Sequence, residues 1–154
     1  MISRGRIDEH QAQMPLFRGM SNHQLRKIAS FGTEVSGKRG MVLTHEGRPG
    51  SEFFMVYGGT VEVLAGGRLV ATRGTGDYLG EIALLGARFR TATAVAATPV
   101  VVKVLSRREF SSLLAEVPEL TDQLRAGIDR RLGELRTPST ESATRTPVGG
   151  VRVG

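Results

Sequence analysis

Two side chains of opposite charge, Glu81 and Arg90, lie at the two ends of a short segment that opens with Gly80. Arg90 precedes a run of β-forming residues, and a planar guanidinium suits a bidentate contact with a phosphate. A single helical turn after Gly80 would expose unpaired backbone N–H groups, which also attract an anion. Because a carboxylate repels a phosphate, Glu81 needs a different partner, and a ribose hydroxyl would provide one. A carboxylate suited to a sugar hydroxyl, together with backbone amides and an arginine suited to a phosphate, indicates a nucleotide-binding site.

The residues of this segment resemble the phosphate-binding cassette of the cyclic-nucleotide-binding family. That family includes bacterial catabolite-activator proteins, the regulatory subunits of cAMP-dependent kinase and cyclic-nucleotide-gated channels. Its pattern is Gly-Glu, a small or aliphatic pair, Leu, a variable loop, Arg, a small residue, Ala, and then Ser or Thr. The matching residues are Gly80-Glu81-Ile82-Ala83-Leu84 and Arg90-Thr91-Ala92-Thr93. Residues 15–17, 40–47 and 54–61 also resemble elements of the family, so the likeness covers roughly residues 14–136.

The resemblance implies a role for most residues of the segment. Glu81 would accept a hydrogen bond from the ribose 2′-OH, and Arg90 would pair with the cyclic phosphate. Gly80 would supply the tight turn at the wall of the pocket, and the backbone amides of Ala83 and Ala92 would help to hold the phosphate. The predicted ligand-binding residues are Gly80, Glu81, Ile82, Ala83, Leu84, Arg90, Thr91 and Ala92.

The resemblance also bears on the base and on the element that closes the site. In kinase-like relatives a Thr after the Arg, here Thr91, leans to cGMP, whereas bacterial relatives carry Ser or Thr there and bind cAMP. The prediction is therefore cAMP, with cGMP as the second choice. Family members close the site with a C-terminal helix, here 118–136, and its candidate lid residues are Leu124, Ile128 and Leu132. These three apolar residues on one side of the helix fit a role in the core or in a dimer interface equally well. They do not identify the residue that recognises the base.

The elements around the segment form a helix, a series of short strands and two further helices. Capping boxes at Ser21–Gln24 and Ser106–Glu109 predict the starts of two helices. Pro118 suits the first position of the final helix, which Gly127 and Gly133 weaken. The predicted strands are 33–36, 41–44, 53–57, 60–65, 69–72, 91–97 and 100–105, with a hairpin turn at Gly66-Gly67. The many short strands indicate a sandwich or barrel rather than a βαβ sheet. With the resemblance, we expect a mainly β fold, a jelly-roll-like β-roll (double-stranded β-helix) with a short phosphate-binding helix and C-terminal lid helices.

The chain length of 154 residues allows one domain with short tails. Residues 1–13 lack periodicity and are predicted to be a loose segment, and 14–136 are predicted to form the domain. Residues 137–154 are rich in Thr, Pro, Ser and Gly, and we expect a disordered tail there. The sequence has no cysteine, no apolar run long enough to span a membrane and no signal-like start, so a cytoplasmic location without membrane association is expected.

Other function classes find little support in the residues. The net charge of +6 is spread along the chain rather than concentrated, so specific DNA binding is not expected. A metal-dependent enzyme of the cupin type needs clustered histidines, whereas His10, His23 and His45 are isolated. With neither a Walker loop nor a Ser-His-Asp arrangement, the prediction is a sensor that is not an enzyme and needs no metal or cofactor.

Two alternatives to a self-contained sensor remain open. One is a catabolite-activator-type transcription regulator that lacks its DNA-binding domain or is separated from it. The other is a degenerate domain that acts in dimerisation or docking, which the intact Glu81 and Arg90 disfavour. In every case the signal must leave through an interface with an effector protein that the sequence does not name, or through a homodimer formed by the C-terminal helix.

Overall fold

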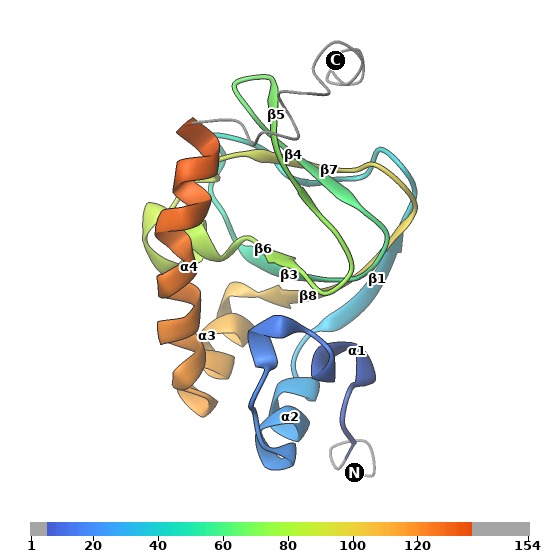
Figure 1. Cartoon of the computed structure of the whole chain (residues 1–154), viewed down its shortest axis with the longest axis vertical. Coiled ribbons are helices and arrows are strands. Elements are labelled where there is room, and N and C mark those ends of the chain that lie inside the picture. The colour runs from blue at the N-terminus through green and yellow to red at the C-terminus, as the bar shows by residue number, and fades with distance from the viewer. Residues whose placement is uncertain (1–5, 137–154) are drawn as a thin grey trace.

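The computed structural model describes residues 6–136, and within that range eight strands form two four-stranded antiparallel sheets. The first sheet has the order β1-β8-β3-β6 and the second the order β2-β7-β4-β5. The two sheets face each other as a β-roll (Figure 1). The strands are β1 Thr33–Gly37, β2 Val42–Thr44, β3 Glu52–Gly58, β4 Val61–Ala65, β5 Arg68–Arg73, β6 Tyr78–Leu79, β7 Thr93–Ala96 and β8 Val100–Ser106.

The predicted fold class is confirmed, and seven of the strands lie close to their predicted positions. The exception is β6, whose two residues pair with β3 and are too few to produce a pattern in the sequence. The predicted β4–β5 turn is also confirmed, since Gly66 and Gly67 have φ angles of 59° and 78°. Two consecutive positive φ values are what a tight hairpin turn requires, and glycine adopts them without steric cost.

Strand β3 organises the interior because both of its faces are buried. Phe54 and Val56 point between the sheets, where they pack with Leu79 and Val102. Phe53, Met55 and Tyr57 point to the other side, where they belong to the core formed with the helices. This is why β3 reads as an uninterrupted apolar run rather than as an alternating strand.

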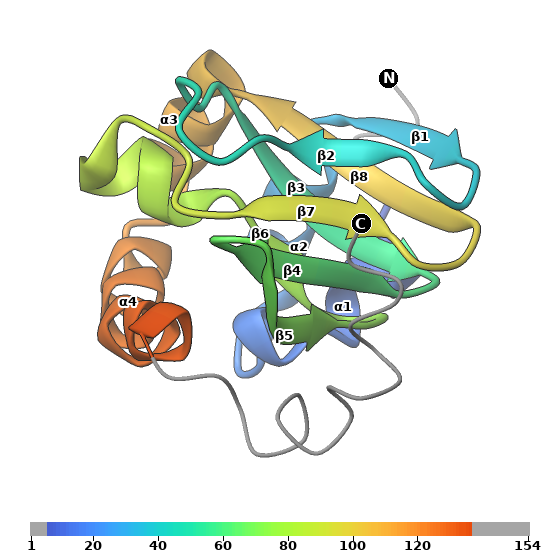
Figure 2. The same ribbon diagram turned by 90° about the horizontal axis from the view of Figure 1, so that it is seen from above.

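The helices cover the outer face of the first sheet (Figure 1). Helix α2, Asn22–Ala29, and helix α3, Arg107–Glu116, both begin with the complete capping boxes that the sequence predicted. Just before α2 in the chain, the short helix η2, Pro15–Phe17, buries Leu16 and Phe17 in the same core. Helix α4, Glu119–Arg136, then runs past the edge of the β-roll (Figures 1 and 2).

The N-terminal segment departs from the expectation of loose chain. Residues Glu9–Ala12 form helix α1, whose N-cap Asp8 accepts hydrogen bonds from the backbone of His10 and Gln11. Asp8 also accepts a hydrogen bond from the Tyr57 hydroxyl, and Gln11 is fully buried. The contact with β3 therefore orders a segment that carries too few apolar residues to show a period. The boundary at residue 14 stays a prediction, and residues 1–5 and the predicted tail 137–154 lie outside the described residues.

No helix within residues 6–136 has both the length and the apolar character that crossing a bilayer requires.

The turn between β3 and β4 leaves no room for a side chain at Gly59. Its φ is +90°, and a Cβ there would lie 2.2 Å from the Pro99 carbonyl oxygen. We expect Gly59→Ala to lower the free energy of unfolding by about 2–4 kcal/mol, from the positive φ together with the clash. Gly133→Ala is the matched control, because nothing lies within 4 Å of a Cβ at this helical position. It should raise stability by up to about 1 kcal/mol. Thermal unfolding measures the stability of both variants. Equal stability changes in Gly59→Ala and Gly133→Ala would contradict the claim that the β3–β4 turn requires glycine at position 59.

Candidate functional site

A cleft of about 530 Å³, part of it open to solvent, lies between the second sheet, the segment 79–92 and the last turns of α4. Figures 1 and 2 both place this segment and α4 on the same side of the β-roll. The residues that line it are Thr44, Val63, Val70, Arg73, Leu79, Gly80, Glu81, Ile82, Ala83, Arg90, Thr91, Ala92, Ala94, Arg131, Glu134 and Leu135.

The structure brings seven of the eight predicted ligand-binding residues to this cleft. Ala83 and Ala92 are buried, and their small side chains let the backbone reach the cleft wall. Leu84 departs from the set, since it packs against the core under the helices. Segment 81–87 is not a regular helix: two helical residues lead into the π-helical turn η3, Ala83–Ala87, where Gly86 leaves helical geometry.

At one end of the cleft, the guanidinium of Arg90 is held by backbone carbonyl groups. Its Nη1 donates to the Gly80 oxygen at 3.2 Å, and its Nη2 donates to the Glu52 oxygen at 2.9 Å. The Glu52 carboxylate lies 3.8 Å from Nη2, and only 6% of the Arg90 side chain is exposed. Burial lowers the pKa of Arg90, but arginine keeps its charge in proteins. With five N–H donors on the group, it retains capacity for an anion in the cleft.

Gly80 is required by the same arrangement. Its φ is +102°, and a Cβ there would lie 2.5 Å from the Glu52 carbonyl oxygen and 3.0 Å from Arg90 Nη1. A side chain at this position would collide with the backbone and displace the arginine. The glycine therefore fixes the turn and also lets Arg90 reach its carbonyl partners.

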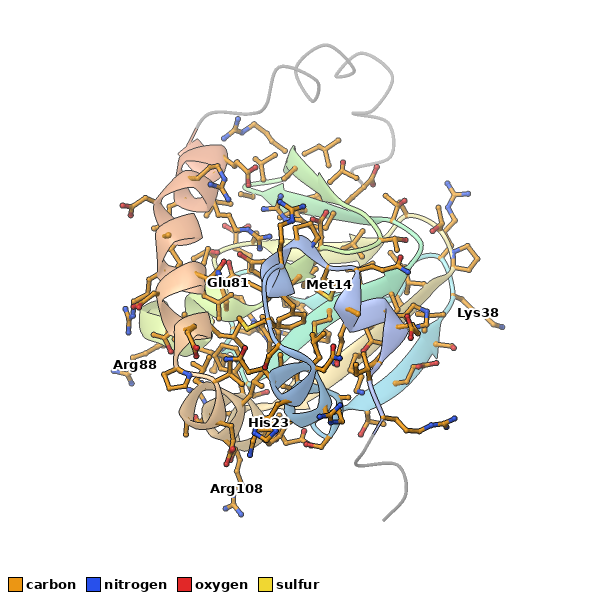
Figure 3. The ribbon with its side chains drawn as sticks, turned by 60° about the horizontal axis from the view of Figure 1, so that its bottom comes forward. Met14, His23, Lys38, Glu81, Arg88 and Arg108 are labelled. Atoms are coloured by element: carbon orange, nitrogen blue, oxygen red, sulfur yellow. The ribbon has the colours of Figure 1, made fainter. Side chains whose placement is uncertain are left out.

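Further along the cleft, Glu81 is a buried carboxylate with a partner on α4. It is 1% exposed, and Arg131 Nη1 lies 3.3 Å from Oε1 and 3.2 Å from Oε2. Figure 3 shows Glu81 lying inward, whereas Arg88 of the same segment projects outward. Burial raises the pKa of Glu81, and the positive charge of Arg131 opposes that shift. The result is a desolvated acceptor group suited to a hydroxyl donor.

Arg131 is itself fixed by further contacts. The same Nη1 donates to the Tyr78 carbonyl oxygen at 2.8 Å, and the guanidinium lies 4.0 Å from the centroid of the Tyr78 ring. A hydrogen bond and a cation–π contact thus hold the side chain in one orientation. A second ion pair joins α4 to the β-roll, with Arg73 Nη2 of β5 2.7 Å from Glu134 Oε1.

The α4 residues at the cleft are not the predicted lid residues. Leu124 is buried in the core under the helices, and Ile128 and Leu132 are half-buried and absent from the cleft lining. The face that meets the cleft carries Arg131, Glu134 and Leu135. The reason is helical geometry: at about 100° per residue, Leu132 lies about 120° around the axis from Leu120, whereas Arg131 lies about 20° from it. Each step of four residues turns about 40° past a full turn, so the apolar stripe from Leu120 has left the cleft-facing side of α4 by Leu132.

Three charged residues of the cleft, Arg73, Arg131 and Glu134, were therefore not predicted from the sequence. Helical periodicity could have pointed to Arg131 and Glu134, because a helical wheel places both near the face that carries Leu120 and Leu124. No sequence pattern singles out Arg73, since a charged residue at the end of a strand is common. Among the described residues, no group of three or more His, Cys, Asp or Glu side chains is arranged to hold a metal ion.

Several known proteins are similar to this chain. Residues 34–117 match the family described as the cyclic nucleotide-binding domain. The regulatory subunit of cAMP-dependent protein kinase from Schizosaccharomyces pombe is 29% identical over 138 residues, which are 85% of this chain and 34% of that protein. The chain thus spans about a third of the length of this curated relative.

Solved structures show the same fold. The cAMP-bound PfPKA-R structure superposes with a TM-score of 0.79 at 26% identity, over 88% of this chain and 47% of the other. The catabolite activator protein of Thermus thermophilus superposes with a TM-score of 0.70 at 29% identity, over 78% of this chain and 59% of the other. Since the family match covers more than half of the sequence and includes the cleft segment, this chain belongs to the cyclic nucleotide-binding domain family.

Proposed function

We propose that this chain binds a cyclic 3′,5′-mononucleotide reversibly, cAMP in preference to cGMP, and acts as a regulatory module without catalysis. The observation that carries the proposal is the placement of Arg90 and Glu81 in one cleft, each buried and held by named partners. A phosphate beside Arg90 and a ribose 2′-OH beside Glu81 would satisfy the two charges in the order in which a nucleotide presents them. The names of the relatives support cAMP, because they include cAMP-dependent kinase subunits.

The proposed signal leaves the cleft through α4. Arg131 links Glu81 directly to this helix, and the Arg73–Glu134 pair adds a second link. A ligand that contacts Glu81 therefore changes the environment of an α4 side chain. Because a ligand shifts an equilibrium only through different affinities for its states, these contacts are where occupancy is converted into helix position. The receiver is an effector protein or a second copy of the chain.

The phosphate contact is tested by Arg90→Gln, with Arg88→Gln as the matched control. Arg88 is an exposed arginine two residues away in the same segment. Removing one partner of a buried charge pair costs about 3–5 kcal/mol, so cAMP affinity of Arg90→Gln should fall by about a hundredfold or more. The control should stay within about threefold of wild type. Calorimetric titration measures affinity, and a folded Arg90→Gln protein with wild-type affinity would refute the phosphate site.

The sugar contact is tested by comparing cAMP with 2′-deoxy-cAMP. A hydrogen bond to a charged group is worth about 1.5–3 kcal/mol, so the wild type should prefer cAMP by about tenfold or more. In Glu81→Ala the preference should shrink to about twofold, because the acceptor is gone. Any general loosening of the cleft affects both nucleotides and cancels in the ratio. If the ratio survives the substitution, Glu81 shapes the segment and does not bind the sugar.

The raised pKa of Glu81 predicts an acid-sensitive affinity. The ionised carboxylate accepts from the 2′-OH, so affinity should fall as the pH drops through the pKa of Glu81, which burial places above that of an exposed glutamate. Arg131 and Arg73 face this carboxylate and lower its pKa, and Tyr78 lies beside it. Arg131→Gln should therefore move the loss of affinity to higher pH. Glu81→Gln should abolish that loss, and identical pH profiles for wild type and Glu81→Gln would contradict the prediction.

A further inference from the structure

The proposed function leaves the residues that contact the base unassigned. If Arg90 holds the phosphate and Glu81 the ribose, the remaining lining must face the base. That remainder is mostly apolar, with Val63 and Val70 from the sheet and Leu135 from α4. Such walls suit the faces of a flat aromatic ring but cannot distinguish one base from another. Discrimination needs polar side chains directed at the ring edge.

Most polar side chains of the cleft are already committed elsewhere. The Thr44 hydroxyl donates to the Ala92 carbonyl oxygen at 2.9 Å. Arg131 is held by Glu81 and by Tyr78, and Thr91 follows Arg90 at the phosphate end. Arg73 and Glu134 then remain as the polar lining residues available to the base. They come from different elements, Arg73 from β5 and Glu134 from α4.

The geometry of this pair presents a donor next to an acceptor. Arg73 Nη2 contacts Glu134 Oε1 at 2.7 Å, so the contact uses one of the two carboxylate oxygens. The side chains are 14% and 29% exposed, which makes Glu134 the more accessible partner. A carboxylate can accept several hydrogen bonds, and a guanidinium has five N–H groups. Both therefore keep hydrogen-bonding capacity for a third group placed beside them.

We propose that Glu134 and Arg73 read the edge of the nucleotide base, with Glu134 accepting from an exocyclic amino group and Arg73 donating to the ring nitrogen beside it. The class of base is one that carries an amino group next to an unprotonated ring nitrogen, as adenine does at N6 and N1. A carbonyl group in the amino position would place its oxygen against the Glu134 carboxylate. This assignment rests on the proposed function and supplies the base-reading residues that the sequence left open.

The test compares cAMP with inosine 3′,5′-cyclic monophosphate, which carries a carbonyl group in place of the amino group and a proton on N1. Wild-type protein should bind cAMP at least about tenfold more tightly, as expected for one hydrogen bond to a charged group. Glu134→Gln keeps the shape of the side chain, but its amide can donate to a carbonyl group. The preference should therefore shrink to about threefold or less. Calorimetric titration of both nucleotides against both proteins gives the ratio.

The ratio separates base reading from a purely mechanical role. If the Arg73–Glu134 pair only ties α4 to the sheet, Glu134→Gln changes both affinities by one factor and the preference stays, which overturns the assignment. Glu119→Gln is the matched control on the same helix, since Glu119 contacts Gln24 away from the cleft. It should leave both affinities unchanged. A wild-type protein that binds both nucleotides equally also overturns the assignment, whereas one that binds neither overturns the proposed function itself.

Discussion

Two opposite charges buried in one cleft, Arg90 and Glu81, set the constraint that the surrounding structure must meet. An isolated buried charge is unstable, so each needs partners from the protein. Arg90 takes backbone carbonyl groups from Gly80 and Glu52, which joins the cleft segment to β3. Glu81 takes Arg131, which joins the same segment to α4. The cleft is therefore the point at which a strand of the β-roll and the last helix are coupled through charge.

The two sides of this coupling differ in how firmly they are held. β3 is buried on both faces, between the sheets on one side and under the helices on the other, and it provides a rigid base for the Arg90 contacts. The end of α4 contacts the β-roll through two ion pairs, through Arg131 on Tyr78 and through the half-buried Leu135, and the helix carries Gly127 and Gly133. A change at Glu81 is thus expected to move the helix before it moves the sheet.

Phosphate, sugar and base recognition divide among different parts of the fold in this proposal. Phosphate recognition rests on the cleft segment and on β3, sugar recognition on Glu81, and base recognition on the Arg73–Glu134 pair. Only the last two involve α4, through Arg131 and Glu134. Any nucleotide could then dock its phosphate, while the sugar and the base determine whether the helix responds.

The sequence by itself determined the β-roll, the two capped helices and the segment from Gly80 to Ala92. These features depend on local patterns: alternating or continuous apolar runs, capping boxes, and glycines at positions of positive φ. It did not show α1, which depends on contacts with β3, or β6, which is two residues long. Nor did it show the partners of the buried charges. The Glu81–Arg131 and Arg73–Glu134 contacts join residues 50 and 61 positions apart. Only tertiary packing, which rotates one face of α4 toward the cleft, decided that these arginines and Glu134 meet there.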